Sequence, residues 1–176
     1  MASMKQSSIL QGVAPKGSVL QVVSTTKTDT YSESVAGETI STTIVTGLTA
    51  AITPVATSSK IRVEVFTFIA NSDNFADGGF VLRRGSTAIG VADTAGSRPS
   101  LSAGGTTVGN NQVDIMPLSV SFVDSPSSTS ELTYGISVYN RDNSTATVYL
   151  NRAHLDGDDA GRNRTISTIT LTEVAG

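Results

Sequence analysis

Short stretches in which apolar and polar residues alternate constrain the fold of this chain more than any other feature. Residues 60–65 and 165–171 are clear examples, and more than a quarter of the chain is Ser or Thr. Side chains of this kind suit a pleated surface with one buried and one solvated face. No window shows sustained helical periodicity. We therefore predict an all-β domain of the β-sandwich type, jelly-roll-like, with a short extended N-terminal arm.

Alternation and turn residues together locate the expected strands. They are residues 19–28, 38–45, 48–52, 59–70, 79–83, 86–92, 112–123, 132–140, 145–151 and 165–174. Leu118, Val120 and Phe122 alternate with Ser and are expected in the core, as are Tyr134, Ile136 and Val138 on a later strand.

The strand at 59–70 has an interruption in its pattern. Ile61, Val63 and Val65 fall on one face, whereas Phe66 and Phe68 fall on the face that carries the polar residues. Either a bulge resets the register, or this end of the strand is covered on both sides.

Length, charge and cysteine content exclude several classes of protein. The 176 residues fit one domain. A net charge of −3, without a run of Lys or Arg, argues against nucleic acid as a partner. The absence of cysteine excludes disulfides and thiolate metal sites. No apolar run has the length of a membrane span and no signal-peptide core is present, so we expect a soluble protein without membrane insertion.

Two segments stand apart from the strand pattern. Residues 1–17 contain Gly12, Pro15 and Gly17, which interrupt regular elements, and we interpret them as an arm for attachment preceding a sandwich domain at 18–176. Residues 93–111 are rich in Gly, Ser, Asn and Thr and are too long for a tight turn. Such loops tend to be functional, so this one is a candidate binding loop.

Catalytic chemistry has little support in the sequence. His154 is the only histidine, so any Ser-His-Asp arrangement would need it, with Asp156 as a possible orienting acid. No Gly-x-Ser-x-Gly elbow presents a nucleophile. Gly104 and Gly109 have the glycine spacing of a phosphate loop but lack the Lys and Ser or Thr that should follow. We predict no catalytic residues and no cofactor, and we interpret His154 as structural.

The acidic stretch at 156–161 resembles the opening of a calcium-binding loop, since Asp156, Asp158 and Asp159 lie close together. The match ends at Ala160, where a third ligand should stand, and at Ser167, where a bidentate Glu should close the site. We predict no metal site and expect a polar turn. In that turn the acids are neutralised by arginines: Arg152, Arg162 and Arg164.

Several stretches together resemble a family of small β domains encoded by bacteriophages, described as tail-fibre or virion structural proteins. The resemblance runs from Gly17 to the end and rests on order and spacing. Its stretches are 17–23, 52–54, 58–61, 85–87, 92–98, 121–126, 151–152, 156–159 and 167–173.

The resemblance implies a non-enzymatic component of the virion, assembled as a homotrimer, with no catalytic residues to carry over. A tail fibre or fibre tip would attach to other virion proteins through residues 1–17 and would present loops such as 93–111 to a host surface glycan or protein. The alternative is a capsid decoration protein whose arm lies across neighbouring capsid subunits and stabilises the head. The short arm, with no shaft, keeps this alternative open.

Two competitors come from other classes of protein. A small glycan-cleaving enzyme needs an acidic pair in a groove lined with aromatic residues, but the chain has no Trp, four Tyr and five Phe. The second competitor is a freestanding carbohydrate-binding module. Both are less well supported than a virion protein that acts by multivalent contact.

Overall fold

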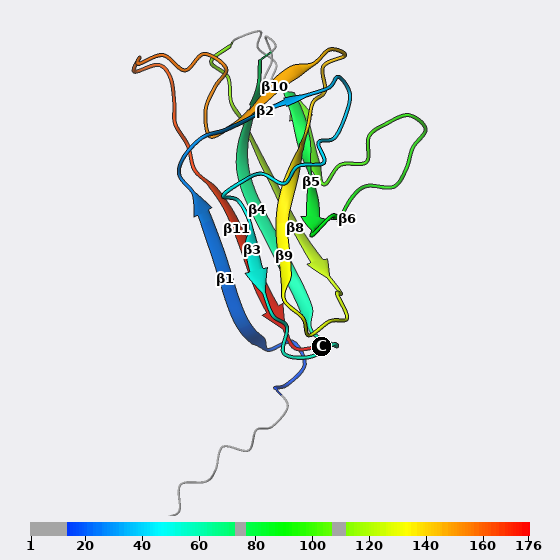
Figure 1. The fold of residues 1–176 in the computed structure, drawn as a ribbon. Coiled ribbons are helices and arrows are strands. Elements are labelled where there is room, and N and C mark those ends of the chain that lie inside the picture. The colour runs from blue at the N-terminus through cyan, green and yellow to red at the C-terminus, as the bar shows by residue number, and fades with distance from the viewer. Residues whose placement is uncertain (1–13, 73–76, 107–111) are drawn as a thin grey trace, which may run out of the picture.

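A computed structural model describes residues 14–72, 77–106 and 112–176. Within these residues the chain is all-β, and two antiparallel sheets pack together as a β-sandwich (Figure 1). The predicted fold class is confirmed. No helix among the described residues is long and apolar enough to cross a membrane.

The larger sheet, sheet A, is built around one long central strand. Its strands are β1 (Val19–Lys27), β2 (Tyr31–Val35), β4 (Lys60–Asn71), β8 (Met116–Asp124), β10 (Ala146–Leu150) and β11 (Ser167–Val174). One edge of β4 pairs with β8, and the other pairs first with β11 and then with β10. Beyond these, β1 pairs with β11 and β2 pairs with β10.

The smaller sheet, sheet B, has β5 and β9 at its centre. Its strands are β3 (Ala50–Ile52), β5 (Asp77–Arg84), β6 (Thr87–Ile89), β7 (Ala103–Thr106) and β9 (Leu132–Tyr139). β5 pairs with β9 on one side and with β6 and β7 on the other, while β3 pairs with the start of β9.

The core lies between the two sheets and is formed by alternate residues of their strands. Tyr134, Ile136 and Val138 are fully buried, as expected from their alternation. Leu118, Val120 and Phe122 pack against the same cluster but remain partly exposed, because β8 is an edge strand of sheet A. The burial of apolar side chains in this layer provides the main driving force for folding.

The largest error of the sequence prediction concerns residues 38–45, which do not form a strand. These residues run alongside β9 without regular strand pairing. Ser41 N donates to Val138 O (2.8 Å), and Val45 N donates to Ile136 O (2.9 Å). Positive φ angles at Glu38 (53°) and Gly47 (79°) interrupt the extended backbone. Val45 is fully buried, and Ile40 and Ile44 are partly buried, which explains why the sequence of this segment resembles a strand.

Two short strands were not predicted. β2 pairs with β10 at the edge of sheet A, and its sequence carries only five residues of alternation. β7, with the sequence Ala-Gly-Gly-Thr, lies inside the segment that we interpreted as a loop. Glycines on both strands allow β7 and β5 to approach closely: a Cβ on Gly104 of β7 would lie 3.2 Å from the carbonyl oxygen of Gly78, and a Cβ on Gly79 of β5 would lie 2.5 Å from that of Ala103.

The pairing of β4 resolves the interruption in its pattern. The register with β8 and with β11 continues without a shift, so the strand has no bulge there. Thr67 takes the inward position and is fully buried, where its hydroxyl hydrogen-bonds the Ser167 hydroxyl (2.8 Å). Phe66 and Phe68 therefore lie on the face of sheet A that points away from the core. Phe66 remains 44% exposed in the single chain.

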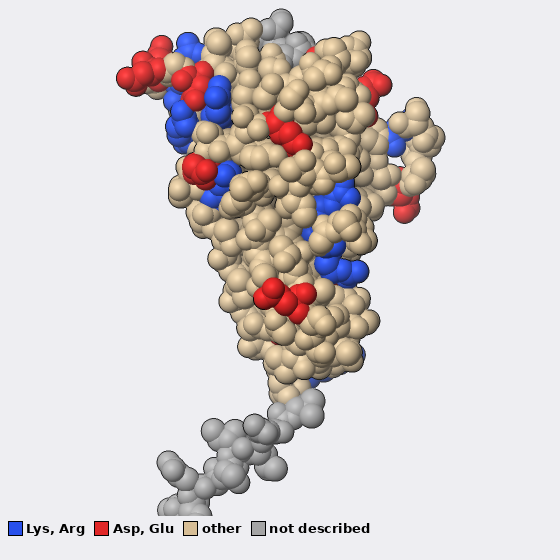
Figure 2. All heavy atoms as spheres, in the orientation of Figure 1, with Lys and Arg blue, Asp and Glu red and all other residues tan. Residues whose placement is uncertain are grey.

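The two ends of the sandwich differ. The start of β1 and the C-terminus lie together at one end, where Gly17 N donates to Ala175 O (2.8 Å) (Figure 1). The connections after β9 and β10 lie at the other end. Figure 2 shows that the molecule tapers toward the end that carries the termini.

Candidate functional site

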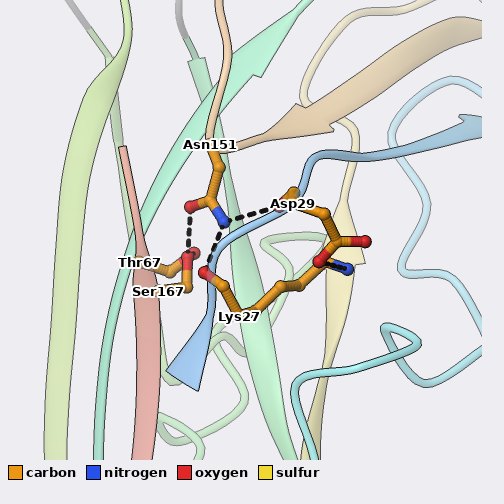
Figure 3. Close-up of polar contacts among 5 residues, drawn as sticks. All are labelled: Lys27, Asp29, Thr67, Asn151 and Ser167. Carbon is orange, nitrogen blue, oxygen red and sulfur yellow. Dashed lines mark hydrogen bonds and ion pairs between the residues drawn. The ribbon is translucent and has the colours of Figure 1, made fainter. Parts of the chain in front are cut away.

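The loops at the broad end are anchored by a buried polar network around Asn151, which follows β10 directly (Figure 3). Its amide nitrogen donates to the backbone oxygens of Lys27 and Asp29, both at 3.0 Å. Its side-chain oxygen accepts from the Ser167 hydroxyl (2.6 Å). Asn151 is fully buried and has a φ of 62°, a conformation that Asn adopts more readily than most residues. One side chain thus joins the ends of β1, β10 and β11.

Asn140 has the same role at the end of β9. Its amide nitrogen donates to the backbone oxygens of Val35, Ala36 and Ser144, at 2.9, 3.2 and 2.9 Å. Its side-chain oxygen accepts from the side chain of Asn71 (3.0 Å). This residue fixes the connection between β9 and β10 to the connection that follows β2.

The 151–166 loop, which joins β10 to β11, carries a compact charged cluster. The Asp156 carboxylate pairs with Arg152 (3.3 Å) and Arg164 (2.6 Å). The Arg152 guanidinium also lies 4.5 Å from the centre of the Tyr149 ring, which is a cation–π distance. Figure 2 shows the acidic and basic side chains together at this corner of the molecule. The expected polar turn is thus formed with two of its three arginines paired to Asp156.

The acids of this loop do not form a metal site with one another. Within the described residues, no three His, Cys, Asp or Glu side chains approach closely enough to hold a metal ion. Asp159 accepts a hydrogen bond from Gly161 N (2.7 Å), and the acids line a shallow hollow of about 330 Å³ together with Arg162 and Arg164.

His154 lies against Tyr149, with 3.3 Å between its Nδ1 and the tyrosine hydroxyl oxygen. The centres of the two rings are 5.7 Å apart. The carboxylate of Asp156, the acid considered as its orienting partner, is engaged by two arginines. These contacts give His154 a packing role at the base of the loop.

The candidate binding loop at 93–111 is described only to residue 106, and residues 107–111 lie outside the described part. Residues 90–102 form a loop that projects from the side of sheet B, which we call the projecting loop (Figure 1). Ala92 N donates to Leu101 O (3.1 Å) at its base, and the tip carries Gly96 with a φ of 63°. The residues between them are exposed to solvent.

An open groove of about 490 Å³ runs between the projecting loop and the end of β9. Its lining residues are Gly78, Ala92, Pro99, Leu101, Gly104, Gly105, Thr106, Tyr139 and Arg141. Arg141 is half-exposed and pairs with Asp77 (3.1 Å). The groove combines an apolar wall, a guanidinium and a phenol, and this combination can bind a small polar ligand through hydrogen bonds and apolar contact.

Tyr139 is suited to donate a hydrogen bond in this groove. Burial raises its pKa above the ordinary value, Glu38 and Asp77 add to the rise, and Arg141 opposes it. The phenol is therefore neutral at physiological pH and retains its proton.

Two of the three buried acids, Asp124 and Glu173, support neighbouring strands and loops. Asp124, at the end of β8, accepts hydrogen bonds from Arg84 and from the Tyr134 hydroxyl, both at 2.7 Å. Burial and this acidic neighbour raise the pKa of Tyr134 well above its usual range. Glu173, in β11, accepts from Gln21 (2.6 Å) and from Val55 N (2.7 Å). Both acids thus connect strands and loops within the fold.

Sequence reasoning missed the two buried asparagines as anchors. Asn-Arg pairs recur in the sequence at 140–141, 151–152 and 163–164, a spacing that neighbouring hairpin strands produce. That spacing does place Asn140 and Asn151 at the ends of β9 and β10. Asn163, by contrast, is exposed in a loop. The dipeptide alone does not distinguish a buried anchor from a surface residue.

No protein-family model matches the chain, and its sequence has no significant match among curated proteins.

Proposed function

We propose that this chain is a non-enzymatic structural protein of a bacteriophage virion, a homotrimer of the tail-fibre or fibre-tip type that contacts the host surface. The observation that carries the proposal is the separation of the two ends of the sandwich. The termini of the described domain meet at the narrow end, and the long loops lie at the broad end (Figure 1). An arm formed by residues 1–17 would attach at one end, and the loops would meet the host at the other.

The hydrogen bonds of the buried polar side chains support a structural role. Glu173, Asp124, Asn140 and Asn151 bind neighbouring strands and loop backbones, so they hold the loops in place. This arrangement suits a scaffold that must present fixed loops, since ordering them beforehand lowers the entropy cost of binding.

The groove beside the projecting loop is the surface that we assign to the host contact. Its ligand would be a surface glycan or a polar peptide, bound by Arg141 and Tyr139 against the apolar wall that includes Leu101. A single open groove binds weakly, but three copies in one trimer can raise the apparent affinity by roughly two to four orders of magnitude.

Gold-labelled antibody against this protein, viewed on intact phage particles by electron microscopy, tests the proposal. We expect label at the tail. Label distributed over the head would replace the fibre assignment by the alternative, capsid decoration. Particles without label, alongside a positive control for a known virion protein, would contradict a place in the virion.

A further inference from the structure

The outward side of sheet A, which we call the outer face, is built mainly from small side chains. It consists of the side chains of β1, β11, β4 and β8 that point away from the core. Most of them are small hydroxyl residues: Ser24, Thr26, Thr168, Thr170, Thr172, Ser119 and Ser121. Short side chains of this kind form a low surface that another protein can approach closely.

Exposed apolar side chains lie among these hydroxyls. Val22 on β1 is 58% exposed, Phe66 on β4 is 44% exposed and Val123 on β8 is 56% exposed. Phe66 packs edge-on against Phe68, with ring centres 5.1 Å apart. Val22 and Val123 lie in one row across the sheet with Thr172 and Arg62 between them, and Phe66 lies four residues further along β4. The exposed apolar side chains are therefore spread across the face among its hydroxyl groups.

The outer face carries few charges, and they lie in one row on β4. Arg62 and Glu64 form an ion pair of 2.7 Å near the middle of the sheet, and both side chains are about half-exposed. Arg62 also reaches the Ser121 hydroxyl (3.3 Å), and Lys60 reaches the Ser125 hydroxyl (2.9 Å). Arg62 and Phe66 belong to the residue types that are enriched in protein interfaces.

The position of the ion pair indicates which partner fits. Arg62 and Glu64 have opposite charges and lie two residues apart on the same strand, so the outer face is complementary in charge to a second copy of itself. The Arg62 side chain of one copy can pair with the Glu64 side chain of the next, and this contact can repeat around a ring. A hollow of about 430 Å³ beside them, lined in part by Phe66, Ser119 and Thr170, offers room for an incoming side chain.

We propose that the outer face of sheet A is the surface through which copies of this chain associate, with Arg62 of one copy pairing with Glu64 of the next and Phe66 packed in the contact. This inference rests on the homotrimer of the proposed function and names its interface. It also accounts for the pattern of β4, because Phe66 and Phe68 would then be covered by another copy of the chain.

Charge exchange in the full-length chain tests the inference. Arg62→Glu would place two acidic side chains at the centre of the face, and Glu64→Arg would place two basic ones there. We expect each variant alone to dissociate, with an apparent dissociation constant raised about 10- to 100-fold. An equimolar mixture of the two variants should regain the oligomer in part, because two of the three contacts in a mixed trimer then join an acidic copy to a basic one. Sedimentation velocity measures all three samples against wild type.

Two further variants separate association from folding. Phe66→Glu should also dissociate the oligomer, whereas Val91→Glu, an exposed apolar residue on the projecting loop, should leave it intact. All four variants should keep the wild-type circular dichroism spectrum. A wild-type oligomer that persists unchanged in Arg62→Glu and Phe66→Glu would overturn the interface while leaving the homotrimer standing. A wild-type chain that is monomeric throughout would overturn both.

Discussion

Glu173 shows how a buried charge stabilises this fold at the scale of one residue. The side chain is fully buried at the end of β11, beside Gln21 and the backbone of Val55. Burial alone would raise its pKa, but the neighbouring Ser59 hydroxyl, Gln21 and the Val55 N–H together hold the pKa below the ordinary value of 4.5. The carboxylate therefore fixes the loop before β4 to the paired ends of β1 and β11.

Glu173→Gln should lower the free energy of unfolding at pH 7 by about 1–3 kcal/mol, because the amide has one acceptor oxygen where the carboxylate has two. The wild type should also lose stability with acid. The pKa of Glu173 is lower in the folded chain than in the unfolded chain. The contribution of Glu173 to the free energy of unfolding is therefore complete above the unfolded pKa and is lost as the pH falls through the folded pKa. Glu173→Gln should lack this pH-dependent contribution to stability.

Urea unfolding of both proteins between pH 7 and pH ~3 measures the difference. Glu131→Gln, at an exposed position before β9, is the matched control and should change stability by less than about 0.5 kcal/mol. Equal pH profiles for wild type and Glu173→Gln would show that Glu173 does not act as a folded-state carboxylate.

At the scale of elements, Asn151 joins strands that are distant in sequence. Asn151→Gly keeps a residue that tolerates a φ of 62° and removes only the side-chain hydrogen bonds. We expect a loss of about 2–4 kcal/mol in the free energy of unfolding, since the Ser167 hydroxyl and two backbone oxygens lose partners. Asn163→Gly, at the exposed Asn-Arg pair, should cost little. Chemical denaturation measures the free energy of unfolding of both variants. Equal losses in the two would refute the anchoring role of Asn151.

The elements also show what sequence can predict. Strands with several alternating apolar residues, such as β4, β9 and β11, were found because burial of one face imposes a period of two. The prediction of a strand at 38–45 was wrong because a buried residue such as Val45 gives the segment the apolar composition of a strand. Its backbone makes only irregular hydrogen bonds with β9. β7 escaped because Gly104 and Gly105 serve close packing and carry no side chain that could alternate.

The sites were less predictable than the strands. The polar turn around Asp156 could be anticipated, since acids and arginines lie within a few residues of one another in the sequence. The groove could not, because it joins Leu101 and Arg141 from segments forty residues apart. The sequence placed Phe66 on the polar face of its strand but left a bulge possible. The continuous register between β4 and β8 excludes the bulge.

At the scale of the whole molecule, we propose a separate task for each surface of one sandwich. In this proposal the narrow end would carry the attachment, the broad end and the groove would meet the host, and the outer face of sheet A would join the copies. Association would also stabilise a domain that has no disulfide, since binding of folded chains to one another favours the folded state. The three tasks are compatible because they use different sides of the molecule.

The mass of the full chain in solution, measured by sedimentation equilibrium over a wide range of concentrations, tests the central claim most directly. The chain has a mass of 18.1 kDa, so three copies give about 54 kDa. We predict that this species dominates at micromolar concentration. A single-chain mass at every concentration would contradict both the homotrimer and the interface assigned to the outer face.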